Sequence, residues 1–221
     1  MIKAILIDID DTILDFKKSS KNAFINTIKD FNLTYKDEYF SYFEQINSDL
    51  WRDQKLGKIS IKNLFKKRSA MMIEYLGLCE DNNFFTETFS ENLSHQAILV
   101  DGIEDLLSYL NNKYKLYAAS NSVYKRQVSR LKKANLYNFF DGIFVSDTLG
   151  YEKPDGKFFE KIIDQIDFNK NEVIMIGDSL KSDIVGAKNA QIKSILFSEK
   201  DTENKIYNYK VKNLSEIKNI L

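Results

Sequence analysis

Cysteine, proline and tryptophan are almost absent from this chain of 221 residues, in which each occurs once. The single cysteine, Cys79, has no partner for an internal disulfide, which fits a reducing cytosol. It also excludes a metal site built on several thiolates. No internal repeat or low-complexity segment interrupts the chain. The sequence therefore predicts an ordinary globular protein that folds without disulfides.

Neither sign of charge is in excess, because 32 lysines and arginines balance 32 aspartates and glutamates. Such a balance gives no reason to expect nucleic acid or an anionic membrane as a partner. No apolar run approaches the roughly 18–20 residues that span a bilayer. The N-terminus enters an apolar strand pattern directly, without the features of a secretory signal. We therefore expect a soluble, cytoplasmic protein.

Two kinds of periodicity divide the chain. Residues 16–95 lack strand-like runs and carry apolar residues at helical spacing, such as Phe24, Ile28 and Phe31, which predicts four amphipathic helices packed as a small bundle. From residue 96 onward, apolar strand runs alternate with helices. This alternation predicts an α/β fold, a Rossmann-like and mostly parallel sheet with helices on both faces. The core is then 1–15 and 96–221, with 16–95 as an all-α insertion after the first strand.

Local patterns place the individual elements of the core. Strands are expected at 115–120, 142–146, 172–177 and 193–197, with a weaker one near 209–211. Helices are expected near 123–133, 155–166 and 181–190, and a last helix closes the chain. Asp101 and Glu104 have the spacing of a capping box that opens another helix. The segment 147–153 is expected to be a loop.

An acidic run ends the first strand. The apolar residues 5–7 lead directly into Asp8, Asp10 and Asp11, and alternate residues of a strand share a face. Two adjacent carboxylates repel each other unless a cation lies between them, so Asp8 and Asp10 point to a metal-dependent site. A strand end followed by an Asp/Thr turn explains the same run equally well.

Polar residues also follow the other strands, at the edge where open α/β sheets bind ligands. Ser120 and Asn121 end one strand, Asp178 follows another, and Lys153 lies in a loop before Pro154. Hard oxygen ligands with a hydroxyl and a lysine suit magnesium and a phosphoryl group. Each has a plainer reading: Lys153 as a surface lysine, Asp178 as a helix cap, and Ser120-Asn121 as a turn.

Four motifs in order resemble the haloacid dehalogenase-like hydrolase superfamily over the whole chain. They are Asp8-Ile-Asp10-Asp11-Thr12, Ser120-Asn121, Lys153-Pro154 and Gly177-Asp-Ser-Leu-Lys-Ser-Asp183. Residues 16–95 match in position the helical cap that this family inserts between its first and second motifs. The resemblance implies a helical cap that selects the substrate and a core that handles the phosphate.

The resemblance also implies roles for the motif residues. Asp8 would attack the phosphoryl group and form an aspartyl-phosphate, and Asp10 would act as general acid and then as general base. Mg²⁺ would be held by Asp8, the backbone carbonyl of Asp10, Asp178 and Asp183. Ser120, Asn121 and Lys153 would bind the phosphoryl oxygens, as would backbone N–H groups after Asp8. Because true haloacid dehalogenases typically lack an acid at position 10, phosphate ester hydrolysis fits this chain better.

The insertion carries the candidates for substrate contact. Arg68 lies on an otherwise apolar helical stripe, and we expect it to meet a structural partner or the substrate. Trp51 suits stacking on a base, although a lone tryptophan is more often a core residue. Asp49-Leu-Trp-Arg52, Gly57-Lys-Ile-Ser60 and the helix of Arg68 resemble the bacterial pyrimidine 5′-nucleotidases that act on noncanonical nucleotides. One departure is Gln191, where those relatives usually have glycine.

Together these features imply a Mg²⁺-dependent phosphomonoester hydrolase, and most closely a nucleoside 5′-monophosphatase with pyrimidine preference. Two alternatives stay open: a phosphatase of small metabolites such as phosphoglycolate or sugar phosphates, and a non-catalytic binding or regulatory module on the same fold. The expected partner is a small phosphorylated metabolite, with no nucleic acid and no membrane. The expected assembly is a monomer or a homodimer.

Overall fold

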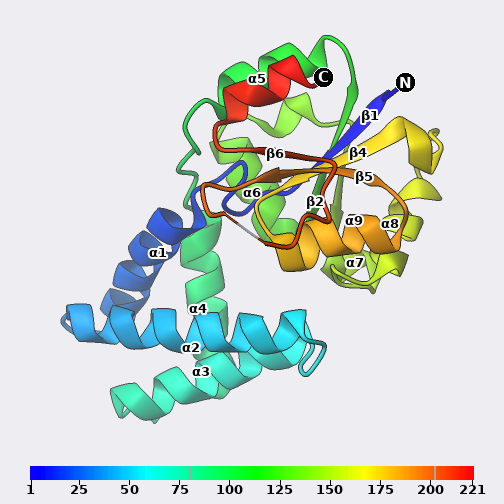
Figure 1. Cartoon of the computed structure of the whole chain (residues 1–221). Helices are drawn as coiled ribbons and strands as arrows, with labels where there is room; N and C mark the ends of the chain where they lie inside the picture. The colour runs from blue at the N-terminus through cyan, green and yellow to red at the C-terminus, as the bar shows by residue number, and fades with distance from the viewer. Residues whose placement is uncertain (80, 202) are drawn as a thin grey trace. The chain divides into compact units, whose positions relative to one another are not determined.

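The computed structural model of the chain describes residues 1–79, 81–201 and 203–221 (Figure 1). The chain divides into two compact units. One unit, the α/β unit, joins Met1–Phe16 to Ala97–Leu221, and the other, the helical unit, is Lys17–Gln96. Within the described residues, none of the helices combines the length and the apolar character that crossing a membrane requires.

A six-stranded sheet forms the centre of the α/β unit. Its strands run in the order β3-β2-β1-β4-β5-β6, and every pairing is parallel. The predicted α/β fold with a parallel sheet is therefore confirmed. The strands are β1 (Ala4–Ile7), β2 (Lys115–Ser120), β3 (Gly142–Val145), β4 (Val173–Gly177), β5 (Lys193–Phe197) and β6 (Tyr209–Val211).

Both faces of the sheet are covered, which explains why β1 is apolar at every position. Ile5 and Ile7 pack in one cluster with α5 (Ile103–Asn111), α6 (Tyr124–Lys133) and the 3₁₀ helix η4 (Leu214–Asn219). Ala4 and Leu6 pack in the other with α8 (Gly156–Ile163) and α9 (Val185–Asn189). Alternate residues of a strand point to opposite faces, so a strand buried on both sides has no polar positions.

The structure corrects three sequence-based expectations about helices. The capping box at Asp101 and Glu104 is wrong, because α5 begins after Gly102, which has φ 81° and contributes no side-chain cap. The helix after β4 begins as a π-helix, η3 (Leu180–Ile184), and continues as α9. The segment expected to be a loop contains the short helix α7 (Ser146–Leu149). Two further 3₁₀ turns are η1 (Tyr137–Phe139) and η2 (Lys170–Glu172).

The described residues of the helical unit form four helices, α1 (Phe16–Asp30, of which Phe16 belongs to the α/β unit), α2 (Asp37–Lys55), α3 (Ile61–Leu76) and α4 (Asn82–Ser94). Its core is aromatic: Phe24, Phe43, Phe85 and Phe89 are buried against one another. Ring pairs of this kind add stabilisation beyond the apolar area that they bury. The helix pattern read from the sequence is thus present, with one helix for each predicted apolar stripe.

Candidate active site

The carboxyl edge of the sheet gathers the polar residues that follow β1, β2 and β4. β1 lies between the other two strands, with Ile7 paired to Ala118 and to Ile176. Because all three strands are parallel and in this register, they end at the same edge. Asp8 directly follows β1, and its backbone N–H donates to Ile176 O at 2.9 Å. The backbone of Asp8 is therefore fixed at the centre of the sheet.

Three carboxylates meet at this edge. Oxygen atoms of Asp8, Asp178 and Asp183 lie within 4.8 Å of one another. Asp8 and Asp183 are buried, and Asp178 is half-buried. Burial is the largest influence that raises the pKa of Asp8 above its ordinary value, and the charges of Asp183 and Asp178 raise it further. Carboxylates this close favour the uptake of a cation.

Lys153 provides one positive charge to this cluster. Its side chain is buried, and Nζ donates to Asp8 Oδ1 at 2.6 Å, to Asp183 Oδ1 at 2.7 Å and to Ala119 O at 2.8 Å. Burial lowers the pKa of Lys153, but the charges of Asp183 and Asp8 outweigh burial and raise the pKa above its usual value. Lys153 therefore stays protonated and joins the nucleophile candidate Asp8 to Asp183.

The backbone of Lys153 is held by the side chain of Asn121. Asn121 Nδ2 donates to Lys153 O and Asn121 Oδ1 accepts from Lys153 N, both at 2.8 Å. On the other side, Asn189 Nδ2 donates to Pro154 O at 3.1 Å. The amide of Asn121 is thus committed to orienting Lys153 in this structure, and its contact with phosphate stays a prediction.

Asp183 is placed by the π-helix that follows β4. Its Oδ2 accepts from Ser179 N at 3.0 Å, and its backbone N–H donates to Ser179 O at 3.0 Å. A Cβ atom at Gly177 would lie only 2.4 Å from Asp183 Oδ2. Glycine at position 177 is therefore required for this close approach, which brings Asp183 to within reach of Lys153. π-Helical turns of this kind are frequent at functional sites.

Asp10 lies in a second hydrogen-bonded group, formed with helix α6. Gln127 Nε2 donates to Asp10 Oδ2 at 2.8 Å, and Arg130 Nη1 donates to Asp10 Oδ1 at 2.5 Å. Gln127 Nε2 also donates to Ser120 Oγ at 3.0 Å. Sequence reasoning did not identify Gln127 or Arg130. The available signal was that α6 has too few apolar residues to fill the face it buries against the sheet.

The Asp11 side chain binds the backbone at the start of α1. Asp11 has φ 63°, a conformation that aspartate tolerates better than most residues, and its Oδ1 accepts from Phe16 N at 2.9 Å. Thr12 is buried, and among the described residues its hydroxyl has no hydrogen-bond partner. Asp11 therefore starts helix α1 and is not one of the three clustered carboxylates.

The two candidates for substrate contact both lie in the helical unit. Arg68 is buried, with Nη1 donating to Asn47 Oδ1 at 2.7 Å. Its guanidinium carbon lies 5.0–5.2 Å from the ring centroids of Phe43, Phe65 and Phe89. Trp51 is half-buried and packs edge-on against Phe65, at 6.3 Å between centroids. Contact of either residue with a substrate stays a prediction.

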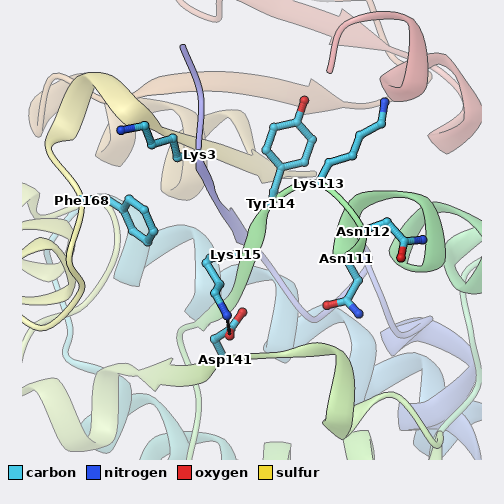
Figure 2. Close-up of a pocket in the computed structure, with 8 residues that line it drawn as sticks. All are labelled: Lys3, Asn111, Asn112, Lys113, Tyr114, Lys115, Asp141 and Phe168. Atoms are coloured by element: carbon cyan, nitrogen blue, oxygen red, sulfur yellow. Dashed lines mark hydrogen bonds and ion pairs between the residues drawn. The ribbon is translucent and has the colours of Figure 1, made fainter.

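The opposite, amino edge of the sheet has a different character. A pocket of about 320 Å³ lies there, lined by Lys3, Lys115, Asp141 and Phe168 among others (Figure 2). Lys115 Nζ pairs with Asp141 at 2.6 Å, and Lys3 Nζ pairs with Glu172 at 2.6 Å. Lys115 and Lys3 in this pocket are thus each paired with a carboxylate. The buried carboxylate cluster with its lysine lies at the carboxyl edge, where α/β sheets bind their ligands.

A parallel sheet covered on both faces, with buried carboxylates and a lysine at its carboxyl edge, is an arrangement typical of α/β enzymes. The chain belongs to the haloacid dehalogenase-like hydrolase family, whose model matches residues 5–197. The family resemblance read from the motifs is therefore confirmed, and so is the expectation of an enzyme.

Three relatives illustrate the similarity. The pyrimidine 5′-nucleotidase PynA of Streptococcus pneumoniae is 35% identical over 204 residues, which cover 91% of this chain and 86% of PynA. The crystal structure of the hydrolase YfnB from Bacillus subtilis, bound to magnesium, matches with a TM-score of 0.92 and 29% identity, covering 100% of this chain and 98% of YfnB. A glyceraldehyde 3-phosphate phosphatase of Methanothermobacter thermautotrophicus is 27% identical and covers 92% of this chain and 88% of its own length.

Proposed function

We propose that this protein hydrolyses phosphate monoesters with the help of Mg²⁺, and that Asp8 is the nucleophile. The observation that carries this proposal is the contact between Asp8 and Lys153 inside a cluster of three carboxylates. Lys153 provides a positive charge next to the attacking oxygen, where an anionic phosphoryl group would have to approach. A carboxylate is a competent nucleophile once it is ionised and correctly placed.

Two carboxylates take part in the bonds that form and break in the proposed reaction. An Asp8 oxygen forms a bond to phosphorus while the ester P–O bond breaks, and the leaving oxygen takes a proton from the Asp10 carboxyl. Water then attacks the phosphorus of the aspartyl-phosphate and gives a proton to the Asp10 carboxylate, while the bond between phosphorus and the Asp8 oxygen breaks and its electron pair returns to Asp8. Inorganic phosphate leaves, and Asp8 returns to its starting form. Ser120 and Lys153 are proposed to bind the phosphoryl oxygens.

The acidic cluster fits the metal that the family implies. Asp8, Asp178 and Asp183 offer hard oxygen donors, which Mg²⁺ prefers, and these three carboxylates outnumber the single ammonium group of Lys153 that contacts two of them. Bound Mg²⁺ would neutralise charge on the phosphoryl oxygens. The residues proposed to hold it are Asp8, Asp178 and Asp183, together with the backbone carbonyl of Asp10.

For the substrate, we propose a nucleoside 5′-monophosphate with a pyrimidine base. The support is the similarity to PynA, which is named as a pyrimidine 5′-nucleotidase. The similarity to a glyceraldehyde 3-phosphate phosphatase supports the second candidate, a small phosphorylated metabolite. We propose that the helical unit selects between such substrates. Rates with UMP, dUMP, dTMP, AMP, phosphoglycolate and sugar phosphates decide the substrate, and a clear preference for purine nucleotides or phosphoglycolate contradicts the pyrimidine assignment.

The role of Asp8 as nucleophile is tested by comparing it with Asp11, a nearby aspartate in the same segment. Asp8→Asn should abolish phosphate release from p-nitrophenyl phosphate in the presence of Mg²⁺, because a neutral amide is a poor nucleophile. Asp11→Asn is the matched control: Asp11 lies three residues away and outside the cluster, so its variant should retain most of the activity. Substantial activity of a folded Asp8→Asn would remove Asp8 from its role. A wild-type protein without turnover would favour the non-catalytic binding module.

A further inference from the structure

Two side chains of helix α6 donate hydrogen bonds to the two oxygens of the Asp10 carboxylate. Arg130 Nη1 donates to Oδ1 and Gln127 Nε2 donates to Oδ2, and both donors come from fully buried side chains. The Asp10 side chain is 28% exposed, so the carboxylate lies at the surface of this group and its two partners lie below it. With both oxygens engaged, rotation about the last side-chain bond of Asp10 is restricted.

The amide of Gln127 is itself fixed in one orientation. Its Oε1 accepts from Arg130 Nη1 at 3.0 Å, while its Nε2 donates to both Asp10 Oδ2 and Ser120 Oγ. A flipped amide would place an oxygen against the carboxylate, which is an unfavourable contact between two acceptors. Gln127 therefore joins the end of β1 to the end of β2 through one side chain.

The hydrogen bond from Gln127 determines the direction in which the Ser120 hydroxyl can donate its proton. Ser120 is 2% exposed, and its oxygen accepts the second proton of Gln127 Nε2. A hydroxyl has a single proton, which must then be donated away from Gln127. Gln127 thus leaves the Ser120 proton available to an acceptor outside this group, such as a phosphoryl oxygen.

Stability alone is a poor reason for this arrangement. Burying a guanidinium costs free energy, which pairing with a carboxylate often does no more than offset, and an apolar side chain at position 130 would fill the same space without that cost. The residue that benefits from Arg130 is Asp10, whose carboxylate gains a defined position.

We propose that Gln127 and Arg130 are positioning residues for the reaction: they hold Asp10 in place for proton transfer, and Gln127 also directs the hydroxyl of Ser120. This inference rests on the proposed phosphomonoesterase function. Loss of either residue should slow the step in which Asp10 gives its proton to the leaving group. An alkoxide leaving group needs the proton of Asp10 as the ester P–O bond breaks, whereas p-nitrophenolate departs with its electron pair and needs no proton. Both substrates share the second step, in which Asp10 takes a proton from water.

The test measures the first step separately for the two kinds of ester, in Gln127→Leu and Arg130→Met. For an alkyl phosphate that the wild type hydrolyses, we expect single-turnover transfer to slow by about 10–100-fold, and the burst of nitrophenolate from p-nitrophenyl phosphate to stay within about threefold of wild type. The KM for the alkyl ester should change little. Arg130→Lys, which keeps a positive charge that can donate to Asp10, should recover part of the lost rate.

Lys133→Met provides a control on the same helix. Lys133 is also a basic residue of α6, but it is exposed at the end of the helix, whereas Gln127 and Arg130 are buried against Asp10. Its loss should leave the ratio of the two ester rates at the wild-type value. If Gln127→Leu and Arg130→Met slow both esters by the same factor, or slow neither, the positioning role is overturned.

Crystal structures of the two variants separate this inference from the proposed function. A wild-type enzyme that hydrolyses no phosphate monoester contradicts the proposed function. The structures still decide the positioning role in that case: we expect the Asp10 carboxylate to leave its present position in each variant. An Asp10 side chain that is unchanged in both variants overturns the proposal.

Discussion

Lys153 is the residue on which the electrostatic balance of the site depends. It forms ion pairs of 2.6 Å with Asp8 and 2.7 Å with Asp183 while being almost completely buried. Removing one partner of a buried ion pair leaves the other charge without compensation, which is far more costly than losing an exposed pair. Here a single substitution would leave two buried carboxylates without their shared cation.

We predict that Lys153→Met abolishes activity and destabilises the protein by about 3–5 kcal/mol near neutral pH, which lowers the Tm by roughly 10 °C for a chain of this size. Thermal unfolding followed by circular dichroism measures the change. Lys161→Met, at an exposed lysine of α8, is the matched control and should leave the Tm nearly unchanged.

The stability of Lys153→Met should also depend on pH differently from that of the wild type. The pKa of Asp8 is raised by burial even with Lys153 present, and losing that cation raises the pKa further. The folded variant then binds more protons than the unfolded chain at pH values above about 4, where an unfolded aspartate ionises. Its stability must fall as pH rises through this window. We therefore expect the Tm difference from wild type to be larger at pH 8 than at pH 5. A difference that is constant with pH contradicts this account.

At the scale of whole elements, the sequence predicts where a strand ends, but it does not predict which face of a helix points toward the site. The run 5–7 followed by Asp8 marks a strand end directly, because a buried strand cannot continue through charged residues. The pattern of α6 did not reveal that Gln127 and Arg130 face Asp10, since nothing in local sequence specifies which face of a polar helix meets a distant loop. Likewise, the π-helical turn that places Asp183 depends on tertiary packing against Gly177.

The chain adopts a left-handed conformation just after the end of α9. Gln191 has φ 62° and donates its N–H to Lys188 O at 3.0 Å. A left-handed conformation costs a residue with a Cβ roughly 1–2 kcal/mol, and glycine avoids that cost. The helix end is thus retained here in a strained backbone conformation.

We predict that Gln191→Gly stabilises the protein. The relief of backbone strain exceeds the extra entropy that glycine gives the unfolded chain, for a net gain of about 0.5–1 kcal/mol and a rise in Tm of about 1–3 °C. Gln165→Gly is the matched control, because Gln165 is exposed and is not among the described residues with positive φ. It should be neutral or destabilising. A Gln191→Gly variant that is less stable than wild type would show that the Gln191 side chain stabilises this helix end by other contacts.

At the scale of the whole molecule, the proposed metal site connects segments that are far apart in sequence. Asp8 follows the first strand, whereas Asp178 and Asp183 follow the fourth, and the entire helical unit lies between them in the chain. A cation bound by all three carboxylates is bound only when the sheet has formed. A ligand that binds the folded state alone adds stability in proportion to the logarithm of its concentration above its Kd.

Addition of Mg²⁺ should therefore raise the Tm of the wild-type protein, and a Mg²⁺ concentration of 100 times the Kd corresponds to about 2.7 kcal/mol or roughly 5–10 °C. Gly177→Ala should lose most of this shift, because its Cβ would occupy the space of the Asp183 carboxylate, at 2.4 Å from Oδ2. Gly156→Ala is the matched control: its Cβ would lie 3.4 Å from the Asn189 backbone, away from the carboxylates, so the shift should persist. Equal shifts in both variants would place the metal elsewhere than at Asp183, and no shift in the wild type at millimolar Mg²⁺ would contradict a Mg²⁺ site at this edge of the sheet.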